Sequence, residues 1–249
     1  MMPWGKHLAI ALLGLLLAMP ARAEGPACGA PADLLEAAAL RGTAVAVTRG
    51  TLRIMVVGSA STQTGGTSGI NATWPHRFQR LLAARLPQVQ VDLRNEGARG
   101  MTAAEHARVL ADLGTDYRPH LVIWQLGTVE AARGLSADDM ADTVKTTAGH
   151  IRAARGERTD VVLMDPQFSR FLRANADVEL YRDRLKMAGA ASGAQFFSRW
   201  AIMKYWSENE RLDLERAPRS QRVTVADELH DCLARALVEF VLDGVREAR

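Results

Sequence analysis

Apolar and polar stretches alternate along the chain in a regular order. Short runs rich in Val, Ile and Leu, without polar alternation, are typical of strands buried on both faces of a parallel sheet. Five such runs lie at Leu52–Val57, Val89–Leu93, His120–Leu126, Asp160–Met164 and Ala194–Phe197. Segments with helical spacing separate them at Trp74–Leu86, Thr102–Leu113, Ala137–Ala153 and Val178–Ala191, and a final helix runs from about His230 to Val245.

Strands and helices repeated at this spacing predict βαβ units with right-handed crossovers. The fold class is therefore α/β, a three-layer α/β/α sandwich around a five-stranded parallel sheet. No repeat, low-complexity tract or linker divides residues 51–249, which we expect to form one domain. Residues 24–50 predict an N-terminal helical extension, "PADLLEAAALRG", packed on the outside of that domain.

The first 23 residues, "MMPWGKHLAIALLGLLLAMPARA", differ from the rest. One lysine precedes an apolar run and a small-residue end, the pattern of a secretory signal peptide with cleavage before Glu24. The apolar run, Leu8–Met19, is shorter than the roughly 20 residues of a spanning helix. An uncleaved anchor is the alternative. No later segment predicts a membrane span, so we expect a periplasmic or secreted protein.

Composition narrows the possible partners. The chain has 249 residues and 48% hydrophobic residues, enough for one good core. Of its 31 basic residues, Lys6 and Arg22 lie in the expected signal peptide, which has no acidic residue, so 29 basic residues face 28 acidic ones after cleavage. Because no Lys/Arg stripe with interleaved aromatics remains, we expect no nucleic-acid partner.

Two cysteines, Cys28 and Cys232, remain after cleavage. In an oxidising compartment such a pair predicts a disulfide between the N-terminal extension and the last helix. The alternative is two unrelated buried thiols.

Candidate chemistry is expected in the loops that follow the strands, because ligands of open parallel sheets bind beyond the carboxyl ends of the strands. These loops read "GSAST", "NEGARGMT", "QLGTVEAARG" and "MDPQF", and "VADELHDC" stands just before the expected last helix.

Taken together, these loops resemble the SGNH (GDSL) hydrolases, a family of esterases, lipases, acetylhydrolases and thioesterases. The resemblance runs from Leu52 to Leu242 and keeps the family's blocks in order. It implies a flavodoxin-like strand order and an ester hydrolase without a cofactor. The nucleophile block of an exported bacterial branch reads Gly-Ser-Ser-Ser-Thr, which places Ala60 where the nucleophilic serine belongs.

The other blocks match in part. Asn-x-Gly-x-x-Gly is matched by "NEGARG", so the resemblance makes the Gly100 N–H an oxyanion donor. In Gly-x-Asn-Asp the glycine fits, but Val129 stands at the asparagine and Glu130 at the acid. Asp-x-x-His is matched by Asp227 and His230, although Cys232 follows this histidine much sooner than in the related branch.

The missing side chains matter because a serine hydroxyl needs a positioned His base, itself oriented by a carboxylate. Loss of one oxyanion donor typically lowers the rate by about 10²–10³. Ala60 has no oxygen and Val129 has no donor. Ser59 or Ser61 could act as a shifted nucleophile only after a local bulge, since a one-residue shift turns the side chain to another face. Otherwise both serines bond to local backbone and cap the next segment.

Two functional hypotheses follow. In the first, the protein is an esterase or acetylhydrolase with Ser59 or Ser61 as nucleophile, His230 as base and Asp227 as its orienter. In the second, which we favour, it is a catalytically impaired or inactive relative that binds a small acyl ester, an acylated glycan or a lipid. Alternatively, Asp227 and His230 only cap the terminal helix.

Several other residues predict structure rather than chemistry. We expect Glu130 to be an exposed loop residue, with replacement of a lost polar partner as the alternative, and His76 to sit in the first turn of a helix. The aromatic segment "FFSRWAIMKYW", Phe196–Trp206, predicts core packing, with an apolar substrate groove as the alternative. No metal is expected, because His7, His106, His120 and His150 make no metal-ligand spacing.

Overall fold

The computed structural model describes residues 26–154, 159–209 and 212–249, so the expected signal peptide lies outside the described part. Its strands form one five-stranded sheet in the order β2-β1-β3-β4-β5, in which every pair is parallel. Their bounds are Thr51–Val57 for β1, Gln90–Asn95 for β2, Leu121–Gln125 for β3, Asp160–Met164 for β4 and Gln195–Phe197 for β5. The predicted fold class and strand order are confirmed.

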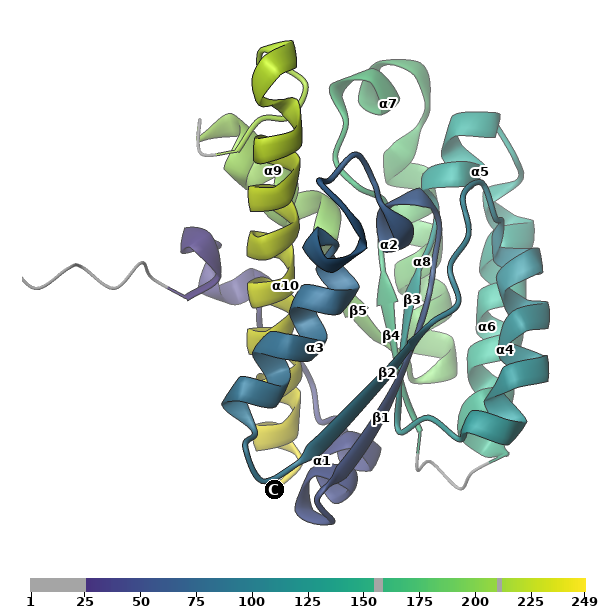
Figure 1. The fold of residues 1–249 in the computed structure, drawn as a ribbon. Helices are drawn as coiled ribbons and strands as arrows, with labels where there is room; N and C mark the ends of the chain where they lie inside the picture. The colour runs from purple at the N-terminus through teal and green to yellow at the C-terminus, as the bar shows by residue number, and fades with distance from the viewer. Residues whose placement is uncertain (1–25, 155–158, 210–211) are drawn as a thin grey trace, which may run out of the picture.

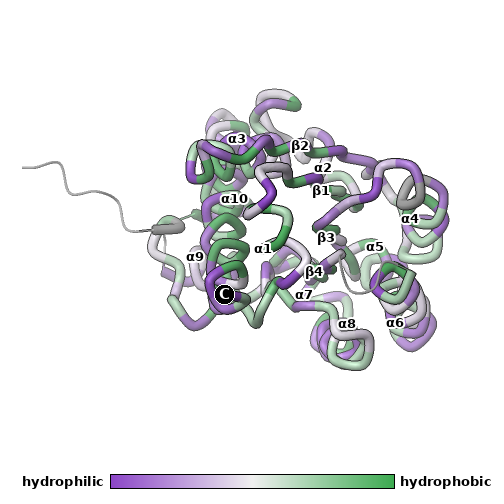
Figure 2. Tube along the Cα trace, turned by 90° about the horizontal axis from the view of Figure 1, so that it is seen from below, coloured by the Kyte–Doolittle hydropathy of each residue, from purple (hydrophilic) through white to green (hydrophobic). Residues whose placement is uncertain are grey.

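Helices cover both faces of the sheet (Figures 1 and 2). One face carries α4 (Ala103–Tyr117), α6 (Ala137–Ala153) and α8 (Val178–Ser192), and the other carries α1 (Arg41–Thr48), α3 (Trp74–Arg85), α9 (Arg199–Glu208) and α10 (Arg222–Glu247). Three short helices, α2 (Ala60–Gln63), α5 (Thr128–Arg133) and α7 (Arg170–Asn175), stand at the carboxyl edge of the sheet. Single 3-10 turns occur at Pro26–Gly29 (η1), Ala32–Leu34 (η2), Ile70–Ala72 (η3) and Arg219–Gln221 (η4).

The core lies where the sheet meets these helices. The central strands β3 and β4 are buried at every residue, as uninterrupted apolar runs predict. Edge strand β2 alternates between exposed and half-buried residues, which matches its single neighbour. Helix α9 adds buried aromatic residues, among them Trp200 and Trp206, so the aromatic segment packs as core as predicted.

The N-terminal extension differs in detail from its prediction. The α-helix begins only at Arg41, so it takes in just the last two residues of the stretch expected to be helical, and the rest of that stretch holds only the turn η2. Leu40 explains the difference, because its N–H donates to Gly244 O at 2.8 Å and its side chain is buried against α10. Tertiary contacts here override helix propensity. Thr43 then fixes α1 to the sheet by donating from its N–H and its hydroxyl to Asp160 Oδ2, both at 2.7 Å.

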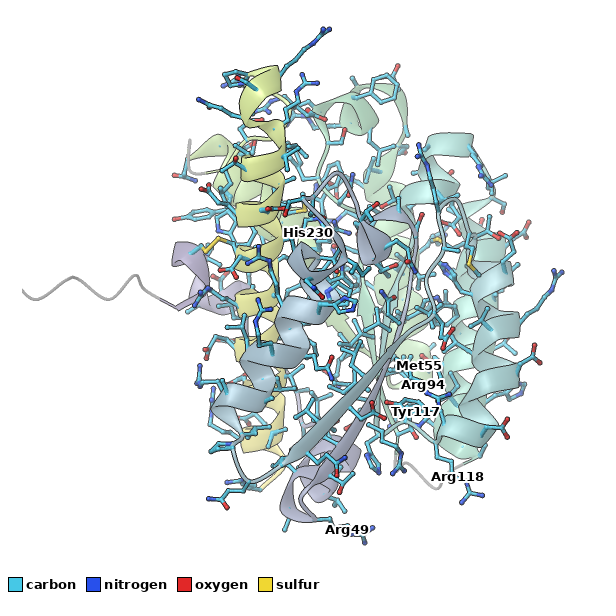
Figure 3. All side chains as sticks on the ribbon, in the orientation of Figure 1. Arg49, Met55, Arg94, Tyr117, Arg118 and His230 are labelled. Carbon is cyan, nitrogen blue, oxygen red and sulfur yellow. A yellow bond between two sulfur atoms is a disulfide. The ribbon has the colours of Figure 1, made fainter. Side chains whose placement is uncertain are left out.

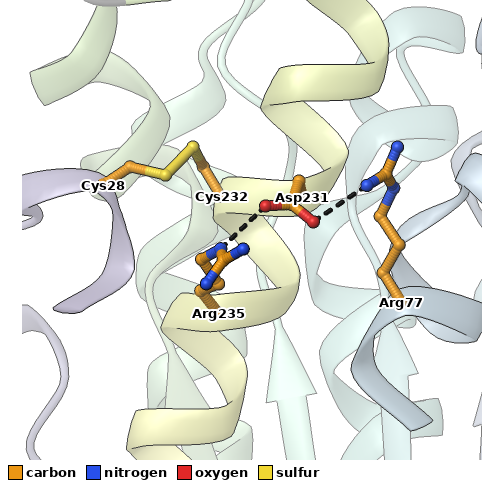
Figure 4. Close-up of a disulfide and its surroundings, with 5 residues drawn as sticks. All are labelled: Cys28, Arg77, Asp231, Cys232 and Arg235. Atoms are coloured by element: carbon orange, nitrogen blue, oxygen red, sulfur yellow. Dashed lines mark hydrogen bonds and ion pairs between the residues drawn. A yellow bond between two sulfur atoms is a disulfide. The ribbon is translucent and has the colours of Figure 1, made fainter. Parts of the chain in front are cut away.

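The predicted disulfide is present. Cys28 and Cys232 are bonded across a sequence separation of 204, which joins η1 to α10 (Figure 4). Beside it, Asp231 makes ion pairs with Arg77 of α3 at 2.8 Å and with Arg235 at 2.7 Å. Within the described residues, no helix is long and apolar enough to cross a bilayer.

Candidate active site

The turn after β1 holds the block that resembles a nucleophile turn. Ser59 is the N-cap residue of α2, and the half-buried Ala60 is the first residue of that helix. Packing requires glycine at position 58, because a Cβ there would lie 2.6 Å from Thr62 Cγ2 and 3.0 Å from Gln125 Cβ. At the position of the family nucleophile, Ala60 presents only a methyl group.

Ser61 is buried, and its hydroxyl has two partners. It donates to Gln125 Oε1 at 2.7 Å and accepts from Arg199 Nη1 at 3.1 Å. An amide oxygen is not a base at neutral pH, and a guanidinium only donates. Nothing in these two contacts removes the hydroxyl proton, as nucleophilic attack would require.

Ser59 is also buried, and its Oγ accepts from the Gly100 N–H at 3.2 Å. This is the N–H that the resemblance assigns to the oxyanion. Gly100 adopts φ +82°, in the left-handed region that favours glycine, so the turn fixes the direction of this N–H. The Ser59 hydroxyl thus occupies the expected donor. Neither serine caps α2 through its side chain, contrary to the structural alternative.

His230 lies in α10, buried between that helix and the segment leading into α3 (Figure 3). Its Nδ1 accepts from the backbone N–H of Trp74 at 3.0 Å. In a neutral imidazole one nitrogen accepts and the other carries the proton, so the proton of this ring is on Nε2. Burial, together with repulsion from Arg199 and Arg77, lowers the pKa of His230 to about 3. The ring is neutral at physiological pH, and its remaining nitrogen is a donor.

The ring nevertheless lies near the nucleophile turn. A Cβ built on Gly65 would lie 2.9 Å from Ser61 Cα and 3.2 Å from His230 Nε2. The structure therefore brings His230 and Ser61 to the same place, as the resemblance implies, but no hydrogen bond joins the two described side chains. Gly65 itself fits between them only because it lacks a side chain.

Asp227 bonds to Ser68 rather than to His230. Its Oδ1 accepts from the Ser68 N–H at 2.9 Å, and its Oδ2 accepts from the Ser68 hydroxyl at 2.6 Å. Partial burial acts to raise the pKa of Asp227, but the hydrogen bonds from Ser68 and the charge of Arg77 outweigh it and lower the pKa. The carboxylate that the resemblance assigns as orienter of the imidazole thus anchors the segment after α2 instead.

Helix α10 begins earlier than predicted, which corrects the expectation of a loop at "VADELHDC". It starts at Arg222, so Asp227 and His230 lie inside it rather than before it or at its N-cap. The reason is local, since residues 222–229 contain neither glycine nor proline and nothing there ends a helix. Residues three apart lie on the same face of a helix, so Asp227 and His230 are neighbours on α10. They do not meet in a loop, contrary to the prediction from the motif.

The loop after β2 packs tightly on the nucleophile turn. Asn95 Nδ2 donates to Thr62 O, and its Oδ1 accepts from the Gly97 N–H at 3.3 Å. A Cβ on Gly97 would lie 2.0 Å from Thr62 Oγ1, so only glycine fits. The family residues Asn95 and Gly97 therefore hold two loops together.

A second buried histidine supports the same turn. His106 Nδ1 accepts from Trp124 Nε1 at 3.1 Å, so its Nε2 donates to Gly58 O at 3.1 Å. Burial lowers the pKa of His106 to about 4. No sequence pattern indicates this role, because Gly58 and Trp124 lie 48 and 18 residues from His106 in the chain.

Glu130 is buried, so the expectation of an exposed loop residue was wrong. It is 4% exposed, and its carboxylate accepts from the Ala103 N–H at 2.6 Å and the Gly127 N–H at 3.1 Å. It joins the start of α4 to the start of α5, and a carboxylate is favoured at both N-termini. Neighbouring Val129 is half-buried and offers no donor at the asparagine position.

Two polar residues of this edge were missed from the sequence, Gln125 at the end of β3 and Arg199 at the start of α9. Arg199 is 1% exposed, and its Nη2 donates to Gln167 Oε1 at 3.1 Å in addition to its bond to Ser61. The available signal was one arginine inside the apolar run "FFSRWAIMKYW". His76 lies in the first turn of α3 as predicted.

Among the described residues, no group of three or more His, Cys, Asp or Glu side chains is arranged to hold a metal ion.

Comparison with protein families finds a match to the Non-GDSL lipase-like family over residues 27–247. Comparison with curated protein sequences gives no match.

Several solved structures are similar to this chain at low sequence identity. A two-domain esterase (CEX) active on acetylated mannans, co-crystallised with mannopentaose, is 16% identical with a TM-score of 0.67, covering 87% of this chain and 56% of that one. TesA is 17% identical with a TM-score of 0.55, covering 74% and 97%. A mutant of Axe2, an acetyl-xylooligosaccharide esterase from Geobacillus stearmophilus, is 17% identical with a TM-score of 0.54, covering 76% and 94%. These likenesses show the fold.

Proposed function

Because the chain belongs to the Non-GDSL lipase-like family, with an SGNH-type fold, we propose that it is an exported esterase-like protein that has lost hydrolysis and binds an acylated ligand or glycan. The single observation that carries the loss of hydrolysis is the hydrogen bond from the Trp74 N–H to His230 Nδ1. A general base must present an unprotonated nitrogen to the serine proton, and here that nitrogen is already an acceptor elsewhere.

Three further contacts support the loss of hydrolysis. Ser61 is held by Gln125 and Arg199, Ser59 occupies the Gly100 N–H, and both oxygens of Asp227 bond to Ser68. Each contact uses a group that ester hydrolysis would need to be free. Together with the methyl group of Ala60, they favour this hypothesis over an esterase with a shifted serine nucleophile.

The ligand class is proposed from the family and from the fold relatives. The two-domain esterase CEX is described as active on acetylated mannans, and Axe2 as an acetyl-xylooligosaccharide esterase. A protein that keeps this fold retains the carboxyl edge of the sheet, where open parallel sheets bind their ligands. Acylated oligosaccharides are therefore the first ligands to test. Export is supported by the signal-like N-terminus and by the disulfide.

The experiment compares the purified protein with Ala60→Ser. Both are given p-nitrophenyl acetate and butyrate, and both are treated with a serine-reactive fluorophosphonate and analysed by mass spectrometry. We expect background hydrolysis and no labelling in either protein, because a serine at position 60 still lacks a free imidazole nitrogen.

Ser59→Ala and Ser61→Ala are the matched controls. Turnover by the unaltered protein that one of them abolishes, or labelling at either serine, would establish the active esterase instead. The binding half of the proposal is tested separately, by the change in melting temperature with acetylated xylooligosaccharides against the same oligosaccharides after deacetylation. A shift with the acetylated form alone is expected, and equal shifts or none would refute acyl recognition.

A further inference from the structure

Arg199 is a buried cation bonded to neutral partners only. Its Nη1 donates to Ser61 Oγ and its Nη2 to Gln167 Oε1, each at 3.1 Å. Its Nε is fully buried and has no hydrogen-bond partner among the described residues. A buried N–H without an acceptor is costly, and on a charged group more so.

The charge of Asp165 acts on Arg199 only through space, because both oxygens of this carboxylate bond to other groups. Asp165 is buried at the end of β4, but its Oδ2 accepts from Arg182 Nε at 2.8 Å and its Oδ1 from the Trp200 N–H at 2.7 Å. Arg182 also pairs with Glu179. Within the described part of the chain, no carboxylate oxygen comes within 4.0 Å of Arg199. The cluster therefore contains two guanidinium groups, the buried carboxylate of Asp165 and the exposed carboxylate of Glu179, and neither carboxylate bonds to Arg199.

We propose that Arg199 binds the carboxylate group of a ligand, so that this site takes the anion of a small organic acid. The inference goes beyond the proposed function, because the group bound here is a free carboxylate, whereas the ligand proposed above carries an acyl ester. A carboxylate next to Arg199 supplies an acceptor for Nε–H and a directly bonded negative charge, which no described residue gives it. A guanidinium is suited to this, since its planar donors match the two oxygens of a carboxylate.

The position of Arg199 agrees with an acyl-binding role. Its guanidinium touches Ser61, one residue from the nucleophile position, and its charge acts on the imidazole of His230. Gly65, on which an added Cβ would meet both of these residues, belongs to the glycine-rich segment that Asp227 anchors through Ser68. A ligand reaches the buried guanidinium by displacing this segment.

The experiment measures binding of acetate and butyrate to the purified oxidised protein by calorimetry and by melting temperature. Acetamide and butyramide serve as neutral probes of the same shape, and inorganic phosphate as a different anion. We expect saturable binding of the carboxylates, none of the amides, and affinity reduced about tenfold or more in Arg199→Gln. Arg173→Gln, an exposed arginine, is the matched control and should bind as the unaltered protein does.

Ser61→Ala gives a second test in which Arg199 stays in place. Loss of the Ser61 hydroxyl frees Nη1, so carboxylates should bind at least as tightly, and weaker binding would contradict the proposal even if Arg199→Gln fails to fold. No saturable binding, equal binding of amides, a response to phosphate alone, or unchanged affinity in a folded Arg199→Gln would each overturn it. Fluorophosphonate labelling of the same samples reports on hydrolysis separately.

Discussion

One hydrogen bond separates His230 from the histidine that an ester hydrolase needs. The Trp74 N–H is part of the backbone at the start of α3, so it cannot turn away as a side chain could. It fixes the proton on Nε2, which under the proposed function keeps the ring out of acid–base chemistry. A sequence shows the presence of a histidine but not which of its nitrogens is free.

The buried imidazole makes stability depend on pH. Unfolded His230 takes up a proton near pH 6.5, whereas the folded ring stays neutral down to about pH 3. Between these values the unfolded chain binds more protons, so the free energy of unfolding decreases as the pH falls. His230→Gln should remove about one proton from this linkage, or about 1.4 kcal/mol per pH unit.

Urea unfolding at intervals between pH 4 and 6 measures that slope. His106→Gln should lower the slope over a similar window, because burial also lowers the pKa of His106 to about 4. A slope equal to that of the unaltered protein in His230→Gln would mean that the ring is charged in the folded state.

Individual residues differed in how far the sequence revealed them. Ala60 and Val129 could be interpreted directly, because the motif fixes their positions and their side chains lack the needed atoms. Glu130 was misjudged, since burial depends on how α4 and α5 approach each other. Arg199 and His106 were missed for the same reason: their partners come from other strands and helices.

Among the elements, the carboxylate of Glu130 joins α4 and α5, which would otherwise begin with unpaired N–H groups. Glu130→Ala leaves the N–H groups of Ala103 and Gly127 buried without an acceptor. We expect the free energy of unfolding to fall by about 3 kcal/mol. Glu130→Gln, which keeps one acceptor oxygen, should lose less.

Urea denaturation measures this effect, and Glu105→Ala is the control. Glu105 caps the same helix through an exposed capping box with Thr102, so its loss should be much smaller. Equal effects of the two alanine variants would show that the bridge between α4 and α5 contributes nothing beyond ordinary capping.

The five strands and the helices α3, α4, α6 and α8 were predicted to within a few residues, because uninterrupted apolar runs and helical spacing carry that information locally. Helices α2, α5, α7 and α9 were not predicted. The ends of the chain were harder. Helix α10 extends eight residues before the predicted start, and the extension is helical at Arg41–Thr48 rather than earlier. Contacts with α10 decide where α1 begins. Helix α10 starts early for a local reason, because residues 222–229 contain nothing that ends a helix.

For the whole molecule, the disulfide is the strongest link between the two ends of the described chain. Closing a loop over a separation of 204 residues lowers the conformational entropy of the unfolded chain, which stabilises the folded state by up to about 5 kcal/mol. The double variant Cys28→Ser, Cys232→Ser should therefore have a free energy of unfolding lower by about 2–5 kcal/mol, and it should unfold at a lower urea concentration.

Expression with residues 1–23 provides the matching compartment test. The chain should be recovered from the periplasm with the disulfide closed and with Glu24 as its first residue. Equal stability of the double-serine variant would show that packing of the extension on α10 is sufficient by itself.

The continuous course of α10 also bears on descent. If hydrolysis has been lost as proposed, a mutation to serine at position 60 brings no benefit while Asp227 and His230 stay in register within one helix. Recovery of hydrolysis would require an insertion before Cys232 that breaks this helix. Independently, it would require release of the Gly100 N–H from Ser59 and of His230 Nδ1 from the Trp74 N–H. On this proposal no single mutation restores hydrolysis, so selection acts only on the binding of the present ligand.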